Sequence, residues 1–260
     1  MPRKAREKSN TGIYHIILRG TNRQEIFHED EDNIMFLETL EKYSRDSGTN
    51  VYGWCLMSNH VHLLLGEGSE ELSITMKRIE VSFVWYYNWK YKTTGHLFQD
   101  RFKSESVESD EYLLTVIRYI HQNPVEAGLV KQVEDWKWSS CHAYYGKNSY
   151  PANLLESNLV LGMFSVDNKH TAISRFINFT ESASASKDKC LDDEIKIRIT
   201  DEDARQAIMR HVEGIEIAQV KSLPKAERDE VFRKIKGIRG VTQRQAARIL
   251  GVSSSLIFKA

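Results

Sequence analysis

The architecture of this chain is indicated most directly by residues 51–65, which read Val51-Tyr-Gly-Trp-Cys-Leu-Met-Ser-Asn-His-Val-His-Leu-Leu-Leu65. Two runs of apolar and β-branched side chains, 51–57 and 60–65, are separated by Ser58-Asn59, a pair that fits a tight turn. The segment therefore predicts a β-hairpin. Because alternate side chains of a strand point to the same face, His60 and His62 project together and Val61 projects the other way.

The flanking sequence supplies further elements of both kinds. Residues 13–18 are β-rich, and residues 97–107 predict another strand or hairpin. Apolar side chains recur at helical spacing over residues 29–47, 70–93 and 110–122. The order β-α-β-β-α-β-α predicts an α+β fold, a ferredoxin-like antiparallel sheet with helices on one face.

The composition is that of a globular protein. Hydrophobic residues make up 41% of the chain, enough to fill a core. No apolar run approaches the roughly 18 residues of a membrane span, and no apolar stretch follows the basic N-terminus as it would in a signal peptide. Cys55, Cys141 and Cys190 lack metal-ligand spacing. We therefore expect a cytoplasmic protein with no membrane partner.

Charge and composition divide the chain into two parts. Residues 181–195 begin with small polar side chains and predict a linker between a domain of residues 1–180 and a helical region of residues 196–260. Residues 221–260 hold ten Lys and Arg against three acidic side chains, a net charge of +7 in a chain whose total is zero. A basic end on a near-neutral body is typical of an appended nucleic-acid-binding region.

The C-terminal sequence also has the pattern of a DNA-binding motif. Residues 242–257 predict a helix, a turn at Gly251 and a second helix that Ser253 can cap. The pattern resembles the helix-turn-helix of replication-initiator-like DNA-binding domains, which makes Arg244, Arg248 and Ser254 candidate DNA contacts. The alternative is a helical appendage that binds another protein.

Two groups of side chains are suited to metal-assisted chemistry. Two neutral imidazoles on one strand face, His60 and His62, can bind a divalent metal, although a half-buried strand can also carry two histidines without one. Tyr119 and Asn123 are spaced i, i+4 on the last predicted helix, so a phenol and an amide face the same way. Pro124 predicts that this helix ends at Asn123. Tyr112 lies on the same side about 10 Å further back and is a second candidate nucleophile.

Several ordered motifs link these groups to a known family. The segments that carry the resemblance are Tyr14-His-Ile-Ile-Leu-Arg19-Gly-Thr-Asn22-Arg23, Met57-Ser-Asn-His60-Val-His62-Leu-Leu64, Leu97-Phe-Gln-Asp-Arg101-Phe-Lys103, Tyr119-Ile-His-Gln-Asn123-Pro-Val125, Gly128-Leu-Val130 and Trp138-Ser-Ser140. Together they resemble the Y1 transposases of the IS200 type, and more narrowly their relatives associated with repetitive extragenic palindromes. The resemblance covers about residues 12–145.

The resemblance implies the fold and the chemistry of an HUH endonuclease. His60, His62 and Asn123 match the metal ligands, and Tyr119 matches the nucleophile. The expected ion is Mg²⁺ or Mn²⁺, although two histidines also suit zinc. Attack by Tyr119 on a phosphodiester would leave a 5′-phosphotyrosine and a free 3′-OH, so DNA could be cut and rejoined.

The expected partner is single-stranded or hairpin DNA. Candidate contacts around the site, each of which can also be read as solvated surface, are Arg19, Asn22, Arg23, Arg101 and Lys103. A homodimer is a further expectation from the resemblance, with the tyrosine acting within one copy or across two. Two other functions stay open: a DNA-binding regulator with a relic catalytic domain, and a metal phosphoesterase that uses water instead of tyrosine.

Overall fold

The computed structural model describes residues 7–21, 24–182, 200–212, 214–215, 217–238 and 240–260. The chain forms two compact units, Met1–Leu191 and Asp192–Ala260, and each is described by itself. Of the predicted linker, Glu181 is the last residue of a helix, and residues 183–195 lie outside the described residues.

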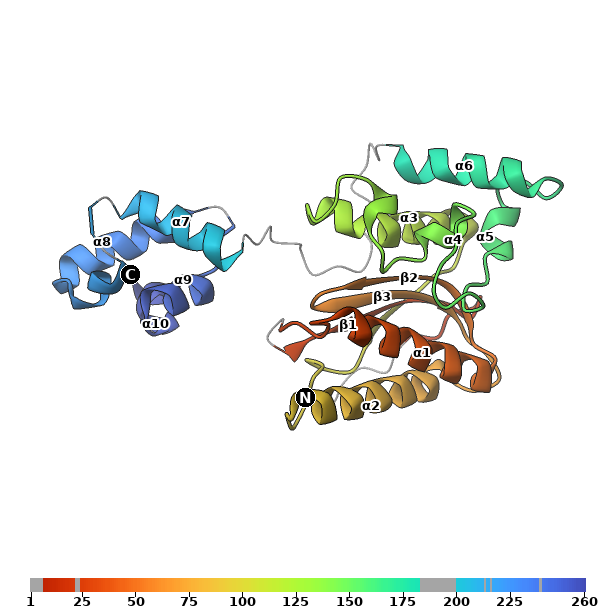
Figure 1. The fold of residues 1–260 in the computed structure, drawn as a ribbon, viewed down its shortest axis with the longest axis horizontal. Coiled ribbons are helices and arrows are strands. Elements are labelled where there is room, and N and C mark those ends of the chain that lie inside the picture. The colour runs from red at the N-terminus through yellow and green to blue at the C-terminus, as the bar shows by residue number, and fades with distance from the viewer. Residues whose placement is uncertain (1–6, 22–23, 183–199, 213, 216, 239) are drawn as a thin grey trace. The chain divides into compact units, whose positions relative to one another are not determined.

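The first unit is built on a four-stranded antiparallel sheet in the order β2-β3-β1-β4 (Figure 1). Its elements in chain order are β1 (Ile13–Arg19), α1 (Asp30–Ser47), β2 (Asn50–Met57), β3 (His60–Gly66), α2 (Leu72–Tyr91), β4 (Lys103–Ser106), α3 (Asp110–Glu126), η2 (Val133–Asp135), α4 (Cys141–Tyr144), α5 (Asn158–Gly162) and α6 (Lys169–Glu181). The predicted α+β fold with an antiparallel sheet and its central hairpin is confirmed. The predicted strand over residues 97–107 is shorter, because only its last part pairs with β1 and Phe98 forms a single bridge to Gly20.

Helices cover both faces of this sheet, so the expectation of helices on one face is wrong. Helices α1 and α2 pack on one face, over Ile16, Leu18, Val61 and Leu63. Helix α3 packs on the other face, with α4, α5 and α6 on the same side (Figure 1). The physical reason lies in the strands themselves: β2 and β3 are buried along almost their whole length, as expected for strands covered from both sides.

Helix α3 also runs further than Pro124 suggested. It continues to Glu126, with the Ala127 N–H donating to the Asn123 carbonyl oxygen at 2.9 Å. A proline removes one backbone donor, but the buried side chains of Asn123 and Pro124 hold the last turn in place. The helix lies close to β2 at Gly53, where an added Cβ would be 2.3 Å from Ile117 Cδ1. Tyr119 and Asn123 are therefore carried on a continuous helix pressed against the sheet.

Residues that follow α3 occupy the outer edge of β2. The backbone N–H of Leu56 donates to the Trp138 carbonyl oxygen at 2.9 Å, and the Ser140 N–H donates to the Trp54 carbonyl oxygen at 3.0 Å. Further along the strand, the Glu156 N–H donates to the carbonyl oxygen of Val51. Three side-chain donors complete this edge: Trp136 Nε1 to Leu56, Ser140 Oγ to Trp54 and Tyr144 Oη to Tyr52.

One buried carboxylate ties α1 to α2. Asp32 accepts hydrogen bonds from the backbone N–H groups of His28 and Glu29 and from the side chains of Tyr86, Lys90 and Tyr91. Burial by itself raises the pKa of this carboxyl group, but the hydrogen bonds from Lys90 and Tyr91 outweigh it and lower the pKa to about 2. The charge of Asp32 is thus fully compensated inside the protein.

Replacing Asp32 with asparagine should destabilise the first unit by about 3 kcal/mol, because Lys90 then loses the buried charge that it pairs with. The melting temperature at pH 7 should fall by roughly 10 °C. The folded pKa is depressed, so this stabilisation is present above about pH 4 and is lost as pH falls towards 2. Wild type and variant should therefore converge near pH 2–3 in thermal unfolding. Asp30→Asn, which removes an exposed ion pair to Lys137, is the control and should shift the melting temperature by less than about 2 °C.

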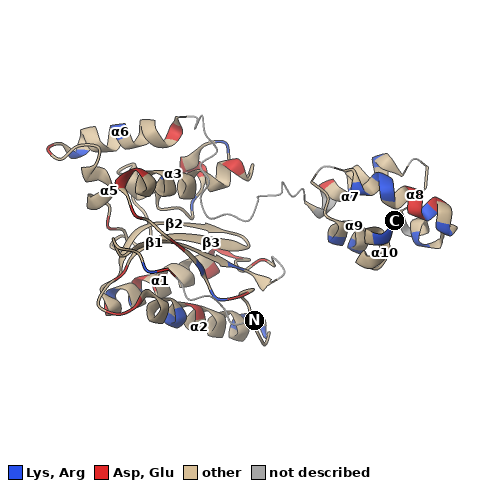
Figure 2. Ribbon diagram, turned by 180° about the vertical axis from the view of Figure 1, so that it is seen from behind, with Lys and Arg blue, Asp and Glu red and all other residues tan. Residues whose placement is uncertain are grey.

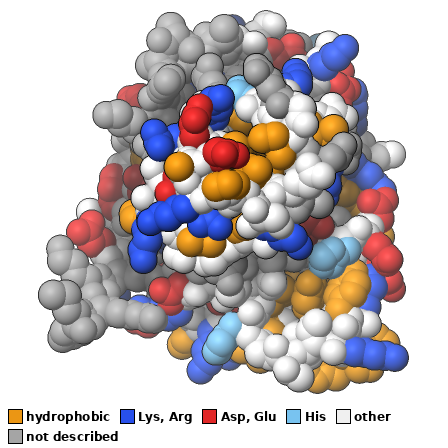
Figure 3. All heavy atoms as spheres, turned by 90° about the vertical axis from the view of Figure 1, so that its left-hand side faces the viewer, with side chains coloured by type: hydrophobic (Ala, Val, Ile, Leu, Met, Phe, Trp, Pro, Cys, Tyr) orange, Lys and Arg blue, Asp and Glu red, His pale blue; other side chains and the backbone are white. Residues whose placement is uncertain are grey.

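The second unit is helical and contains the predicted motif. Its elements are α7 (Asp201–His211), η3 (Ile217–Ser222), α8 (Lys225–Lys236), α9 (Gln243–Leu250) and α10 (Ser254–Lys259). Thr242 caps α9. Gly251 takes the left-handed conformation at the end of α9 and Ser253 caps α10, both as predicted. Figure 2 marks basic positions along α7, α8 and α9, and Figure 3 shows a face on which Lys and Arg side chains lie beside apolar ones.

No helix in the described part of the chain is both long and apolar enough to cross a bilayer.

Candidate functional site

The two predicted histidines lie on the α3 face of β3. His62 is fully buried and His60 is half-buried at the start of the strand, with their ring centroids 5.0 Å apart. His60 Nδ1 lies 2.6 Å from Asn59 Oδ1. A carboxamide oxygen only accepts hydrogen bonds, so this contact is satisfied when His60 carries a proton on Nδ1.

Helix α3 brings Tyr119 and Asn123 to His62. The Tyr119 ring meets the His62 ring edge-on, with the centroids 5.4 Å apart. One turn further on, Asn123 Nδ2 lies 3.3 Å from His62 Nε2. Both α3 side chains are buried. The structure therefore gathers all four predicted residues of the reaction centre from one strand and one helix.

The surroundings keep His62 neutral. Burial, together with the charges of His60, His15 and Arg19, holds the pKa of His62 well below its ordinary value. A neutral imidazole has one ring nitrogen with a free lone pair, which is the form that binds metal ions. The site is thus ready for a cation without first losing a proton.

Asn123 offers the feature that best fits a metal ion. Its Oδ1 atom is buried and makes no hydrogen bond within the described part of the chain. An unsatisfied buried acceptor of this kind is unfavourable by about 1–3 kcal/mol, unless a ligand satisfies it. No three His, Cys, Asp or Glu side chains form a metal-binding group among the described residues. A metal here would instead be held by two imidazoles and one amide oxygen.

The buried histidine next to these residues on α3 has a different role. His121 Nε2 lies 2.8 Å from Ser140 Oγ, and its ring packs against Tyr144 and Phe176. Burial lowers its pKa to about 3. His121 therefore belongs to the core between α3 and α6 and faces away from the site.

The candidate DNA contacts of the first unit fall into three groups. Arg19 ends β1 directly opposite His60, and Lys103 begins β4 opposite Ile17, so both lie on the strand face that carries the histidines. Arg101 is exposed in the segment before β4. Asn22 and Arg23 lie outside the described residues.

In the second unit, Arg244 and Arg248 are exposed on α9 and Ser254 is exposed at the start of α10.

Two neighbours of the site were missed by the sequence analysis. His15 on β1 is fully buried, with Nε2 3.1 Å from His62 Nδ1, and Glu105 Oε2 lies 3.9 Å from His15 Nδ1. The alternation of β1 could have found His15, because it shares a strand face with Arg19. Glu105 carried no such signal, since the pairing of β4 with β1 could not be read from local pattern.

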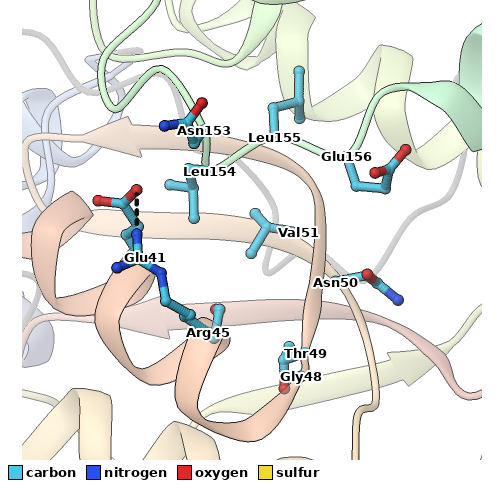
Figure 4. Close-up of a pocket in the computed structure, with 11 residues that line it drawn as sticks. Glu41, Arg45, Gly48, Thr49, Asn50, Val51, Asn153, Leu154, Leu155 and Glu156 are labelled. Atoms are coloured by element: carbon cyan, nitrogen blue, oxygen red, sulfur yellow. Dashed lines mark hydrogen bonds and ion pairs between the residues drawn. The ribbon is translucent and has the colours of Figure 1, made fainter.

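Two surface pockets lie at different distances from the histidine site along the sheet. The pocket in Figure 4, about 300 Å³ in volume, lies between the end of α1, the start of β2 and residues 153–156, and no residue of the histidine site lines it. A larger pocket of about 610 Å³ is lined by Val81, Val84 and Trp85 of α2 and by residues 96–101. The Gln99 N–H donates to the Arg19 carbonyl oxygen at 2.8 Å, so this pocket begins where β1 ends.

Comparisons with known proteins agree on one group. Residues 8–123 match the family model described as Transposase IS200 like. The chain is 26% identical over 146 residues to the REP-associated tyrosine transposase of Escherichia coli (strain K12), covering 55% of this chain and 84% of that protein. It is 26% identical over 161 residues to a putative REP-associated tyrosine transposase of Haemophilus influenzae Rd, covering 56% of this chain and 89% of that protein.

A solved structure of a REP-associated tyrosine transposase bound to a REP hairpin is also similar. It has a TM-score of 0.49 and 22% sequence identity, over 59% of this chain and 90% of that one. The family match at residues 8–123 includes all four residues of the histidine site, and it excludes the helical second unit.

Proposed function

We propose that the chain, whose residues 8–123 match the family model described as Transposase IS200 like, cuts and rejoins single-stranded DNA through Tyr119. The observation that carries the proposal is the contact of Tyr119 and Asn123 with His62, 5.4 Å between rings and 3.3 Å between Asn123 Nδ2 and His62 Nε2. A nucleophile, a neutral imidazole and an amide thus share one buried cluster.

His60, His62 and Asn123 are the residues that would hold a divalent metal, with Mg²⁺ or Mn²⁺ as the proposed ion. The imidazoles suit Mn²⁺, and a carboxamide oxygen suits either ion. When bound, the ion would polarise the scissile phosphate and neutralise charge on its oxygens. Asn123 would satisfy its buried Oδ1 by turning that atom towards the ion.

Tyr119 supplies the nucleophilic oxygen. A bond forms between Tyr119 Oη and phosphorus while the bond from phosphorus to the 3′ oxygen breaks, and the phenol proton leaves with the new 3′-OH. The phosphodiester is exchanged rather than hydrolysed, so a 3′-OH can attack the phosphotyrosine and rejoin a strand. We propose that Arg19 and Lys103, which lie on the strand face that carries the histidines, hold the neighbouring phosphates.

The pocket beside the end of β1 supports unpaired DNA as the substrate. Trp85, with 70% of its surface exposed, offers a ring on which a base can stack, and Arg101 lines the same pocket. Paired bases in a duplex are not available for such stacking. We therefore propose that an unpaired strand beside a hairpin enters over this pocket and reaches the histidines at the end of β1.

The test uses the full-length protein, Mg²⁺ or Mn²⁺, and a hairpin DNA with single-stranded flanks labelled at its 3′ end. Tyr119 becomes joined to the 5′ phosphate of the fragment on the 3′ side of the cut, which carries the label. The label should therefore migrate with the protein on a denaturing gel. Cleavage without an adduct would show a metal phosphoesterase that uses water. Binding without cleavage would show a DNA-binding regulator. A blunt hairpin without flanks is the control and should give no adduct.

We propose that the second unit is a separate DNA contact, supported by its net basic sequence and by the exposed Arg244 and Arg248 of α9.

Replacing Arg244 and Arg248 with alanine should weaken hairpin binding about tenfold at physiological salt and reduce the slope of log affinity against log salt by about 2. The double replacement of Lys221 and Lys225 removes the same charge elsewhere on the unit. If both double variants weaken binding equally, α9 makes no specific contact, and if neither does, the unit serves another partner.

A further inference from the structure

His15 is the buried group that makes the closest contact with His62 and has no role in the proposed reaction. It lies on β1 and His62 on β3, the two central strands of the sheet. Both side chains are fully buried, and their ring planes are inclined by 21°. At 3.1 Å, His15 Nε2 and His62 Nδ1 form a hydrogen bond in which one nitrogen donates and the other accepts.

The direction of this hydrogen bond decides which nitrogen of His62 keeps its lone pair. If His62 donates from Nδ1, its Nε2 carries a lone pair, as a metal ligand must. If His15 donates instead, the single proton of neutral His62 sits on Nε2 and blocks it. The two tautomers of His62 therefore differ in their ability to bind a metal, although the heavy atoms lie in the same places.

Two neighbours favour donation by His62. Glu105 Oε2 lies 3.9 Å from His15 Nδ1, and its negative charge favours a proton on that nitrogen, which leaves His15 Nε2 as the acceptor. The opposite tautomer would turn a bare lone pair towards the carboxylate. At the other end, Asn123 Nδ2 lies 3.3 Å from His62 Nε2, and in this orientation of the amide its N–H meets an acceptor when His62 carries its proton on Nδ1. Both ends of the chain of contacts select the same arrangement.

We propose that His15 is a positioning residue that fixes His62 in the Nδ1–H tautomer, and that the negative charge of Glu105 near His15 Nδ1 favours this arrangement. A row of neighbouring polar groups then crosses the sheet from β4 to α3. It consists of the Glu105 carboxylate, the His15 and His62 imidazoles and the Asn123 amide. His15 touches neither the scissile phosphate nor the metal, and it acts through His62. The metal part of the inference rests on the proposed function, whereas the tautomer is a property of the protein without metal or DNA.

The first measurement is nitrogen-15 NMR of histidine-labelled, metal-free protein, which distinguishes the two tautomers by their ring-nitrogen shifts. The expected result is a His62 that carries its proton on Nδ1 and has a lone pair on Nε2. A wild-type His62 protonated on Nε2 would overturn the proposal. Because no DNA is present, this result is independent of whether the protein forms a covalent adduct.

The second measurement is Mn²⁺ affinity by calorimetry. His15→Phe keeps a ring in the core but removes the acceptor, and it should weaken Mn²⁺ binding about 10–100-fold. His15→Gln restores a carbonyl acceptor and should bind within a few-fold of wild type. His121→Phe, at another buried histidine, should leave Mn²⁺ affinity unchanged. Equal affinity in wild type and in a folded His15→Phe would contradict the proposal; if that variant does not fold, the wild-type tautomer and His15→Gln decide.

Discussion

Replacing Tyr119 with phenylalanine is expected to abolish the covalent protein–DNA adduct, lowering its rate of formation by at least about 10³-fold. The change removes one oxygen and keeps the ring, whose edge-on contacts with His15 and His62 have centroid distances of 5.8 and 5.4 Å. Folding and hairpin binding should therefore be retained. The rate is measured from the appearance of labelled DNA in the protein band of a denaturing gel.

Tyr112 provides the matched control on the same helix. It is half-buried, lies two turns before Tyr119 and is the alternative nucleophile that the sequence suggested. Ring contacts with His15 and His62 are made by Tyr119, so Tyr112→Phe should form the adduct at close to the wild-type rate. An adduct that persists in Tyr119→Phe and disappears in Tyr112→Phe would reassign the nucleophile.

Replacing His62 with alanine should have a comparable effect through the metal. His62 Nε2 lies next to Asn123. Loss of the His62 side chain removes one of the three proposed ligands and also the ring that Tyr119 contacts edge-on. Mn²⁺ affinity should fall by more than about 100-fold, and adduct formation by about 10³-fold at any attainable Mn²⁺ concentration. Calorimetric titration with Mn²⁺ measures the first quantity and the gel assay the second.

A loss of core packing alone would have to be separated from a loss of ligand. His121→Ala supplies that comparison, because His121 is equally buried but is bonded to Ser140 and packed on Phe176. This variant should melt at a lower temperature and still bind Mn²⁺ like the wild type. If His62→Ala titrated like His121→Ala, the metal would not be bound by the histidine pair.

Local pattern was sufficient to predict the parts of the site. The hairpin of residues 51–65 followed from apolar runs and a two-residue turn, and the alternation of β3 placed His60 and His62 on one face. Helical spacing did the same for Tyr119 and Asn123. Periodicity determines which way a side chain points within its own element, so these juxtapositions could be predicted. That α3 meets β3 came from the family resemblance, not from spacing.

What local pattern missed depends on contacts between distant segments. Pairing of β4 with β1 puts Glu105 opposite His15, a register set by sheet assembly rather than by the four residues of β4. Packing of α3 on the second face of the sheet also overrode the helix-ending tendency of Pro124, since the buried last turn is held by its neighbours. Tertiary packing decided both features, and neither leaves a local signature.

The covered edge of β2 has a consequence for how this protein can associate. An exposed sheet edge offers unpaired N–H and C=O groups to any other chain, which invites strand addition and aggregation. Here residues 136–156 occupy those groups from Val51 to Leu56, and they lie beyond the family match at residues 8–123. For a second copy to add a strand at β2, residues 136–156 of the first copy would have to leave this edge. The covered edge of β2 is therefore not available for strand addition by another chain.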